Sequence, residues 1–267
     1  MLRTRVITAL FLLAGFIGVL FVLPDWIAHV VFAIVVALAA WEWSGFMQAE
    51  PRHRIAFAWT TLLIAEWLTL SGLAHVLLPA LSLLAVCFWL FVVPVWFAKR
   101  WLLPRNVVGY LLGWMVLLPC WAALLDLYRK DSWLLLAALA LVWIADVAAY
   151  FFGKAFGRNK LAPTISPGKT REGAAGAMIA VLIYGLSLSL REWPDASVSR
   201  LSGIAVVLVL LTALSIIGDL FESMLKRQAG LKDSSNLLPG HGGILDRIDS
   251  QTSTLPLVAL YFYWMTQ

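Results

Sequence analysis

The chain has 267 residues, of which 62% are hydrophobic, with only 20 Lys and Arg and 15 Asp and Glu residues. Soluble domains are roughly half apolar and a quarter charged, so this composition excludes a soluble globular protein. Plentiful aromatic residues and only two cysteines also exclude disordered, collagen-like and disulfide-stapled secreted proteins. Cys87 and Cys120 both fall in apolar runs, and we expect them to be buried free thiols.

Apolar runs bounded by charge, Pro and Gly predict an all-α polytopic membrane protein with about nine transmembrane helices. A helix needs about 20 mostly apolar residues to span a bilayer. Residues 1–130 form a region of transmembrane helices with short loops, and residues 131–267 form a second transmembrane region that carries nearly all the unusual polar residues. The expected spans are residues 6–23, 26–46, 55–71, 73–98, 107–127, 132–152, 174–190, 201–218 and 254–266.

The cationic residues are distributed unequally between the two sides of the membrane. Alternating loops place 16 Lys and Arg residues on one side, against Arg129, Lys130, Arg191 and Arg200 on the other. The positive-inside rule then predicts a cytoplasmic amino terminus, with both long loops also in the cytoplasm. The net charge of +5 indicates membrane lipids or nucleotide phosphates as partners, and no nucleic acid, because little mass lies outside the membrane.

A first polar cluster begins at Asp146, roughly 9 Å below the cytoplasmic end of the sixth expected span. A carboxylate at that depth should face other helices, a cation or water. The loop over residues 153–173 follows it, with several cations, Gly and Pro. Gly168-Lys169-Thr170 is no P-loop, because Pro163 stands where that motif needs Gly. We expect this loop to bind an anionic ligand; an ordinary positive-inside loop is the alternative.

A second polar cluster begins where the eighth expected span ends. If the helix continues through Lys226, then Asp219, Glu222 and Lys226 share one face, with Ser223 close by. Further on, Asp246 and Asp249 are three residues apart, so a helical turn would point both carboxylates the same way. Magnesium is typically held by one or two carboxylates together with substrate phosphates and water, so these acidic pairs predict a metal–phosphate site.

Cations and a turn accompany these carboxylates. Lys226, Arg227, Lys232 and Arg247 supply counter-charges for phosphate. A solvated mixed-charge loop would explain the charges, but not the turn over residues 239–243 between them. His241 is open to three roles, as a phosphate donor, a proton carrier or a turn residue, and the lack of a second His nearby argues against zinc.

Three acidic residues lie inside other expected spans, namely Glu42, Glu66 and Asp126. For each of them we expect helix–helix pairing or a place near the membrane interface rather than catalysis.

Residues 223–249 resemble the signature of the phosphatidate cytidylyltransferase family, also called CDP-diacylglycerol synthases. The matching residues are Ser223, Leu225, Lys226, Arg227, Lys232, Asp233, Pro239, His241, Gly242, Gly243, Ile244, Asp246, Arg247, Ile248 and Asp249. An upstream stretch, residues 166–173, is similar to the family's Ser-Pro-Lys-Lys-Thr-x-Glu-Gly loop, with Gly168 in place of a frequent Lys. The resemblance covers residues 140 to 250, and the first half of the chain matches only in spanning the membrane several times.

The resemblance implies transfer of CMP from CTP to phosphatidic acid, with magnesium, in a bacterial inner (plasma) membrane. It implies metal ligation by Asp219, Asp246 and Asp249, and phosphate binding or catalysis by Asp146, Lys169, Lys226, Arg227 and Arg247. Further substrate-binding residues are Ser166, Thr170, Arg171, Glu172, Ser223, Lys232, Asp233, His241, Gly242 and Gly243. A second, monovalent cation and a homodimer are left open. The alternatives are a related membrane lipid kinase or nucleotidyltransferase, and an anionic-solute transporter.

Overall fold

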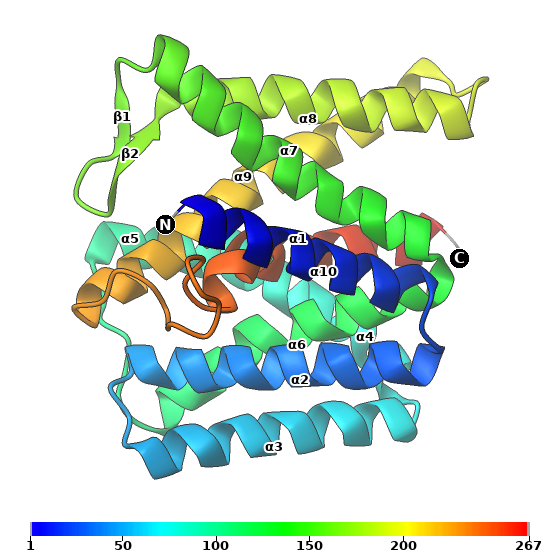
Figure 1. The fold of residues 1–267 in the computed structure, drawn as a ribbon. Helices are drawn as coiled ribbons and strands as arrows, with labels where there is room; N and C mark the ends of the chain where they lie inside the picture. Colours follow the sequence, from blue (N-terminus) through cyan, green and yellow to red (C-terminus); the bar gives the residue numbers. More distant parts are fainter. Residues whose placement is uncertain (1, 266–267) are drawn as a thin grey trace.

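The computed structural model describes residues 2–265 as long helices joined by short connections (Figure 1). Helix α4 continues through a π-helical segment, η1, into α5, so that these three elements form one rod. The helices are α1 (Leu2–Phe21), α2 (Asp25–Phe46), α3 (Pro51–Leu70), α4 (Leu73–Cys87), η1 (Phe88–Val92), α5 (Val93–Lys99), α6 (Val107–Lys130), α7 (Ser132–Phe156), α8 (Arg171–Glu192), α9 (Val198–Gln228) and α10 (Leu245–Met265).

Each expected span corresponds to a helix, but several helices extend beyond the predicted bounds. Helix α9 continues to Gln228, as the shared face of Asp219, Glu222 and Lys226 requires. Helix α10 begins at Leu245, so the expected start at residue 254 is wrong. Hydropathy detects only the apolar part of a helix, whereas the first turns of α10 are polar and are stabilised by contacts with the rest of the protein.

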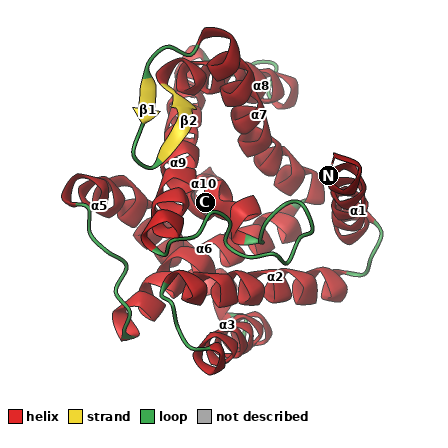
Figure 2. Cartoon of the chain, turned by 60° about the vertical axis from the view of Figure 1, so that its left-hand side comes forward, coloured by secondary structure: helices red, strands yellow, loops and turns green. Residues whose placement is uncertain are grey.

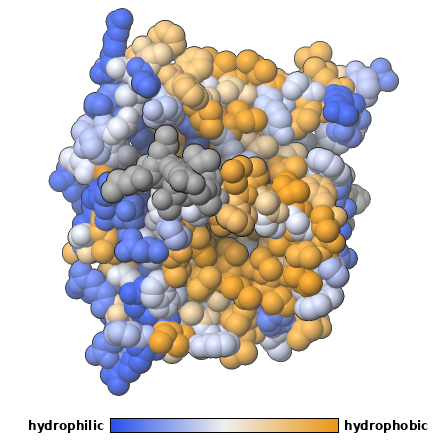
Figure 3. All heavy atoms as spheres, viewed as in Figure 1, coloured by the Kyte–Doolittle hydropathy of each residue, from blue (hydrophilic) through white to orange (hydrophobic). Residues whose placement is uncertain are grey.

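The all-α polytopic architecture is confirmed. Among the described residues, six segments are long and apolar enough to cross a membrane, namely α2, the α4–η1–α5 rod, α6, α7, α8 and α9. The expected number of nine spans remains a prediction. Apolar side chains cover the middle of the face in Figure 3, while hydrophilic residues gather at its left edge, where Figure 1 places the hairpin and the loop before α10.

A small β-hairpin interrupts the helices where only a loop was expected. Strand β1 (Lys160–Ala162) pairs antiparallel with β2 (Ser166–Thr170), with Lys160 opposite Thr170 (Figure 2). The Thr170 side chain then caps α8 by accepting a hydrogen bond from the Gly173 N–H, 3.1 Å away. The cationic loop is therefore a short arm that is anchored to the start of α8.

Helix α10 packs against α4, α6 and α9, so it links the two halves of the chain. Its approach to α9 depends on Gly218, where a Cβ would collide with Ser253. The hydroxyls of Ser253 and Ser250 donate to the carbonyls of Leu214 and Ser215, at 2.7 and 3.1 Å. Small residues and hydroxyls of this kind are typical of tightly packed membrane helices. This contact brings the acidic residues of α9 and α10 close together.

The two cysteines differ in burial. Both are free, and Cys120 is buried as expected, but Cys87 is exposed on the surface of α4, so that part of the prediction is wrong. An apolar run in a membrane helix does not reveal which face is turned inward, because a face in contact with lipid is as apolar as one in contact with protein.

Candidate active site

Three carboxylates from three helices form the first polar group, which we call the carboxylate cluster: Asp146 on α7, Asp219 on α9 and Asp249 on α10. Asp249 interacts electrostatically with both Asp219 and Asp146, and Asp146 also interacts with Asp219. Asp219 and Asp249 are half-buried, whereas Asp146 is exposed. Like charges gathered in this way repel one another, so the cluster favours the arrival of a cation.

The hairpin brings one cation to this cluster. The ammonium of Lys169, on β2, forms an ion pair with the Asp219 carboxylate, and both side chains remain about one-quarter exposed (26% and 28%). The Ser223 hydroxyl donates to the other oxygen of Asp219, 3.3 Å away. Arg247, which is exposed on α10, also interacts electrostatically with Asp146. Two cations therefore face three carboxylates.

Glu172 positions this arm. Its carboxylate accepts hydrogen bonds from the backbone N–H groups of Arg158 and Asn159 and from the Asn159 side chain, at 2.7 to 3.2 Å. These bonds fasten the segment after α7 to the first turn of α8. Thr170 is buried as the α8 cap, so the polar groups of Glu172 and Thr170 are both engaged within the protein.

A second polar group, which we call the loop anchor, comprises Glu42, Glu222, Lys226, Ser234 and Asp246. The Lys226 ammonium lies 2.5 Å from both the Glu222 and Asp246 carboxylates. Asp246 Oδ2 also accepts hydrogen bonds from the Ser234 and Gly243 N–H groups, each at 2.8 Å, and from the Ser234 hydroxyl at 2.9 Å. Both oxygens of Asp246 are thus satisfied by the protein.

Glu42 is the residue of this group that the sequence did not connect to the site. It is fully buried on α2, and its carboxylate accepts hydrogen bonds from the hydroxyls of Ser234 and Ser235, at 3.0 and 2.6 Å. It also accepts from the N–H groups of Ile244 and Leu245, at 2.9 and 2.6 Å, which caps α10. The expected helix–helix pairing of Glu42 holds only for its bond to Leu245 at the start of α10, because its other partners lie on the loop before that helix.

The other predicted residues surround these two groups. Arg227 is exposed and donates to the Leu231 carbonyl, 3.1 Å away, while the backbone N–H of His241 donates to the Leu238 carbonyl at 2.8 Å. Within residues 2–265, the ring Nδ1 of His241 is buried without a hydrogen-bond partner. Of the remaining predicted binding residues, Ser166 lies on β2 and Arg171 is the first residue of α8. Four more lie on the loop before α10, namely Lys232, Asp233, Gly242 and Gly243.

Asp126 belongs to the opposite end of the bundle. Its Oδ1 lies 3.3 Å from Nδ1 of His75 on α4, and its Oδ2 lies 2.9 Å from the ammonium of Lys130 on its own helix. The expected helix–helix pairing of Asp126 is confirmed by its contact with His75.

The carboxylate cluster fits a magnesium ion by its chemistry. Oxygen ligands are the ones magnesium prefers, and it usually takes one or two carboxylates together with phosphates and water. Asp219 and Asp249 provide such a pair, with Asp146 nearby. Among the described residues, no three His, Cys, Asp or Glu side chains already form a complete metal-holding group. An ion bound here would need further oxygen ligands from phosphate or water.

Comparison with known proteins reveals the family. Residues 3–265 match the cytidylyltransferase family. The chain is 41% identical to the phosphatidate cytidylyltransferase of Pseudomonas aeruginosa, with 97% of this chain and 96% of the relative aligned. It is 35% identical to the protein of that name from Haemophilus influenzae, over 99% of this chain and all of the relative, and 34% identical to that from Brucella suis, over 97% and 93%. The chain belongs to the cytidylyltransferase family.

Proposed function

We propose that this protein transfers the cytidylyl group of CTP to phosphatidic acid, producing CDP-diacylglycerol and pyrophosphate. The observation that carries the proposal is the carboxylate cluster with Lys169, at the polar end of a bundle of membrane-length helices. A lipid phosphate and a water-soluble nucleotide meet at a membrane surface, which is where this cluster would lie. The relatives from Pseudomonas, Haemophilus and Brucella bear the name of this activity.

The nucleophile in this reaction comes from the lipid. A phosphate monoester has a second pKa near 6, so its oxygen is largely ionised at neutral pH and needs no strong base. This oxygen forms a bond to the α-phosphorus of CTP while the bond from that phosphorus to the bridging oxygen breaks, and pyrophosphate leaves with the electron pair. The protein's task is to align the two substrates and to neutralise charge.

The lysines of both polar groups are suited to that task. Without substrate, Lys169 is paired with Asp219, and Lys226 is paired with Asp246 and Glu222. When phosphates bind, Lys169 and Lys226 turn toward the phosphate oxygens, which frees Asp219 and Asp246 to face a cation. Arg227 and Arg247 are exposed and supply further positive charge.

We assign magnesium to Asp219 and Asp249, with Asp146 alongside. When bound there, magnesium would neutralise the negative charge that develops as pyrophosphate leaves. Asp246 joins this set only after Lys226 releases it, because both of its oxygens are otherwise engaged.

A reconstituted assay tests the function. Purified protein is supplied with labelled CTP and phosphatidic acid, with and without magnesium, and lipid and nucleotide products are separated. Formation of CDP-diacylglycerol that stops on chelation is expected. A preference for ATP, or for a lipid alcohol over phosphatidic acid, would instead indicate a lipid kinase or another nucleotidyltransferase. Solute flux through liposomes without bond cleavage would indicate a transporter.

We also propose that the carboxylate cluster faces the cytoplasm of a bacterial inner membrane, because most of the Lys and Arg residues lie at this end of the helices. A single cysteine introduced at exposed Lys232 should then react with a membrane-impermeant thiol reagent only in inside-out vesicles, in a background without Cys87 and Cys120. Reaction in right-side-out vesicles would instead show that the carboxylate cluster faces away from the cytoplasm.

A further inference from the structure

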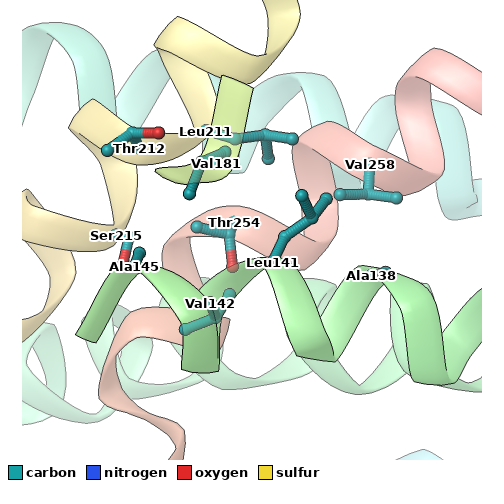
Figure 4. A pocket seen from close by; sticks show the side chains of 10 residues that line it. All are labelled: Ala138, Leu141, Val142, Ala145, Val181, Leu211, Thr212, Ser215, Thr254 and Val258. Atoms are coloured by element: carbon teal, nitrogen blue, oxygen red, sulfur yellow. The ribbon is translucent and has the colours of Figure 1, made fainter. Parts of the chain in front are cut away.

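Two cavities between the described helices differ in size and in lining. The one among α7, α8, α9 and α10 is apolar and has a volume of about 10 Å³, which is room for about one water molecule (Figure 4). The other has a volume of about 200 Å³ and lies between the start of α4 and the end of α6. We call it the Arg129 cavity, and its lining includes His75, Ala122, Leu125, Asp126, Arg129 and Lys130.

The Arg129 cavity lies at the end of the bundle opposite the carboxylate cluster. Helix α7 begins at Ser132, directly after this end of α6, and reaches Asp146 roughly 21 Å further along its axis. The exposed side chains of Trp26 and Trp133 lie at the starts of α2 and α7, at the same end. Exposed Trp is typical of the headgroup region of a membrane, so the cavity lies at the depth of phospholipid headgroups.

Arg129 and Lys130 supply two cations to the lining, and they are held differently. The Lys130 ammonium lies 2.9 Å from Oδ2 of Asp126, so the protein itself provides its counter-charge. Arg129 is exposed and donates from Nε to Nε2 of His29, 3.5 Å away. Among the described side chains, no carboxylate forms an ion pair with Arg129. The lining therefore has one cation without an ion-pair partner in the described part of the chain.

The carboxylate in the lining is covered and does not face an incoming anion. The Asp126 side chain is only 8% exposed, and its Oδ2 is buried against the Lys130 ammonium. Its Oδ1 lies 3.3 Å from Nδ1 of His75, whose own side chain is 67% exposed. An anion that enters the cavity would meet Arg129 and His75 before it met this carboxylate.

Helix α4 presents its positive end to the same cavity. Ala74 and His75 line the cavity and belong to the first turn of α4, which begins at Leu73. First-turn N–H groups have no acceptor within their own helix, and Gly72 at the N-cap has no side chain to supply one. The N-terminus of a helix favours anions. The helix end and Arg129 therefore both favour an anion at this place.

We propose that the Arg129 cavity binds the phosphodiester of a membrane phospholipid, from the leaflet opposite the carboxylate cluster. A phosphodiester carries one negative charge, which matches the one unpaired cation of the lining. The apolar side chains of Ala122 and Leu125 suit the carbon atoms beside the phosphate. Sites for a whole drug-sized molecule usually have roughly 300–1,000 Å³, so a cavity of about 200 Å³ suits a headgroup whose acyl chains stay outside.

Arginine footprinting tests the proposal. The purified protein, in a detergent without phosphate, is treated with phenylglyoxal, which modifies exposed guanidinium groups, and peptide mass spectrometry follows each arginine. Saturating palmitoyl-oleoyl phosphatidylglycerol should slow the labelling of Arg129 at least about fivefold, because a bound headgroup covers its guanidinium. Arg191 is the matched control, since it lies in the last turn of α8, as Arg129 does in α6, but outside the cavity. Its labelling rate should not change.

Two further additions identify the source of the anion. Dioleoylglycerol has two acyl chains but no phosphate, and it should leave the labelling of Arg129 unchanged. Inorganic phosphate supplies the anion without the lipid, and at the same concentration it should slow the labelling less than about twofold. Equal protection by inorganic phosphate would indicate a site for a free anion and would overturn the assignment to a lipid.

Arg129→Gln tests the same site through stability. A ligand that binds only the folded protein raises its melting temperature. Phosphatidylglycerol should raise the melting temperatures of the wild type and of Arg191→Gln equally, and should raise that of Arg129→Gln by less than about half as much. Equal shifts in all three proteins, or equal protection of Arg129 and Arg191 from phenylglyoxal, would overturn the proposal. Neither measurement uses turnover, so both results are independent of the proposed function.

Discussion

The carboxylate cluster and the loop anchor contain the same kinds of side chain, but Glu42 and Asp246 of the loop anchor are satisfied by the protein more fully than the cluster is. Within the described residues, the buried Glu222 carboxylate has only its ion pair with Lys226, and it also interacts electrostatically with Asp249. In the loop anchor, Glu42 and Asp246 each accept three hydrogen bonds and share the Ser234 hydroxyl as a further donor, and Lys226 lies between two carboxylates. In the carboxylate cluster, Asp146 is exposed, and within the described part of the chain Asp219 is paired with Lys169 and Ser223 alone.

This difference separates two uses of buried charge. A buried carboxylate whose oxygens are all paired contributes to holding chain segments in place, because removing a partner leaves an orphaned polar group. Carboxylates that repel one another destabilise the empty protein and become favourable when a cation or a cationic complex binds. We therefore expect substitutions in the two groups to differ in whether turnover or stability is lost first.

The largest effect on turnover is expected for Asp219→Asn. Losing one charge at the position where phosphate charge must be neutralised should lower kcat by about a hundredfold to a thousandfold. The melting temperature should change little, because the substitution relieves repulsion with Asp249 and Asp146 while it weakens the ion pair with Lys169. Asp195→Asn, at an exposed position between α8 and α9, is the control. Near-normal turnover in Asp219→Asn would remove this residue from the catalytic machinery.

Asp246→Asn should lower both stability and turnover, and so it tests whether Asp246 belongs to the loop anchor, to the carboxylate cluster or to both. The neutral side chain loosens Lys226 and cannot accept all the hydrogen bonds that Asp246 accepts, which should cost about 1–3 kcal/mol of stability. Turnover should fall about tenfold or more, because Lys226 is no longer aligned for phosphate. Thermal unfolding and kcat are measured on the same preparation; a loss of turnover with full stability would place Asp246 with the carboxylate cluster alone.

Glu42→Gln should chiefly affect stability. A glutamine amide places N–H donors against the N–H groups of Ile244 or Leu245, which leaves buried donors unpaired at about 1–3 kcal/mol each. Limited proteolysis between residues 229 and 244 should become faster. Turnover should fall in proportion to the fraction of molecules in which this loop has detached from Glu42. If proteolysis and melting are unchanged while turnover disappears, Glu42 acts on substrate directly.

The smallest effect is expected for Gly168→Lys, which restores the residue that is frequent in the family pattern. A Cβ at this position meets no atom within 4 Å, so the side chain fits. Successive residues of a strand point to opposite faces, so the new lysine would point away from the face of β2 that carries Lys169. The KM for CTP should change by less than about threefold; a tenfold decrease would show that this face of the hairpin also contacts phosphate.

Local patterns in the sequence determined much of this protein. Apolar content and run length predicted a polytopic all-α membrane protein, because a bilayer demands long apolar helices whatever their neighbours are. Helical spacing also placed Glu222 and Lys226 on one face, and their ion pair confirms it. The family signature was readable for the same reason, since its residues are close together along the chain.

Only the tertiary structure decided which carboxylates share a site. Asp246 and Asp249 are three residues apart, yet one is bonded to Lys226 and Ser234 while the other faces Asp219 and Asp146. The hairpin that delivers Lys169 and the link from Glu42 to α10 were equally absent from local patterns. These arrangements depend on how closely helices distant in the chain approach one another, and sequence spacing within one helix carries no information about that approach.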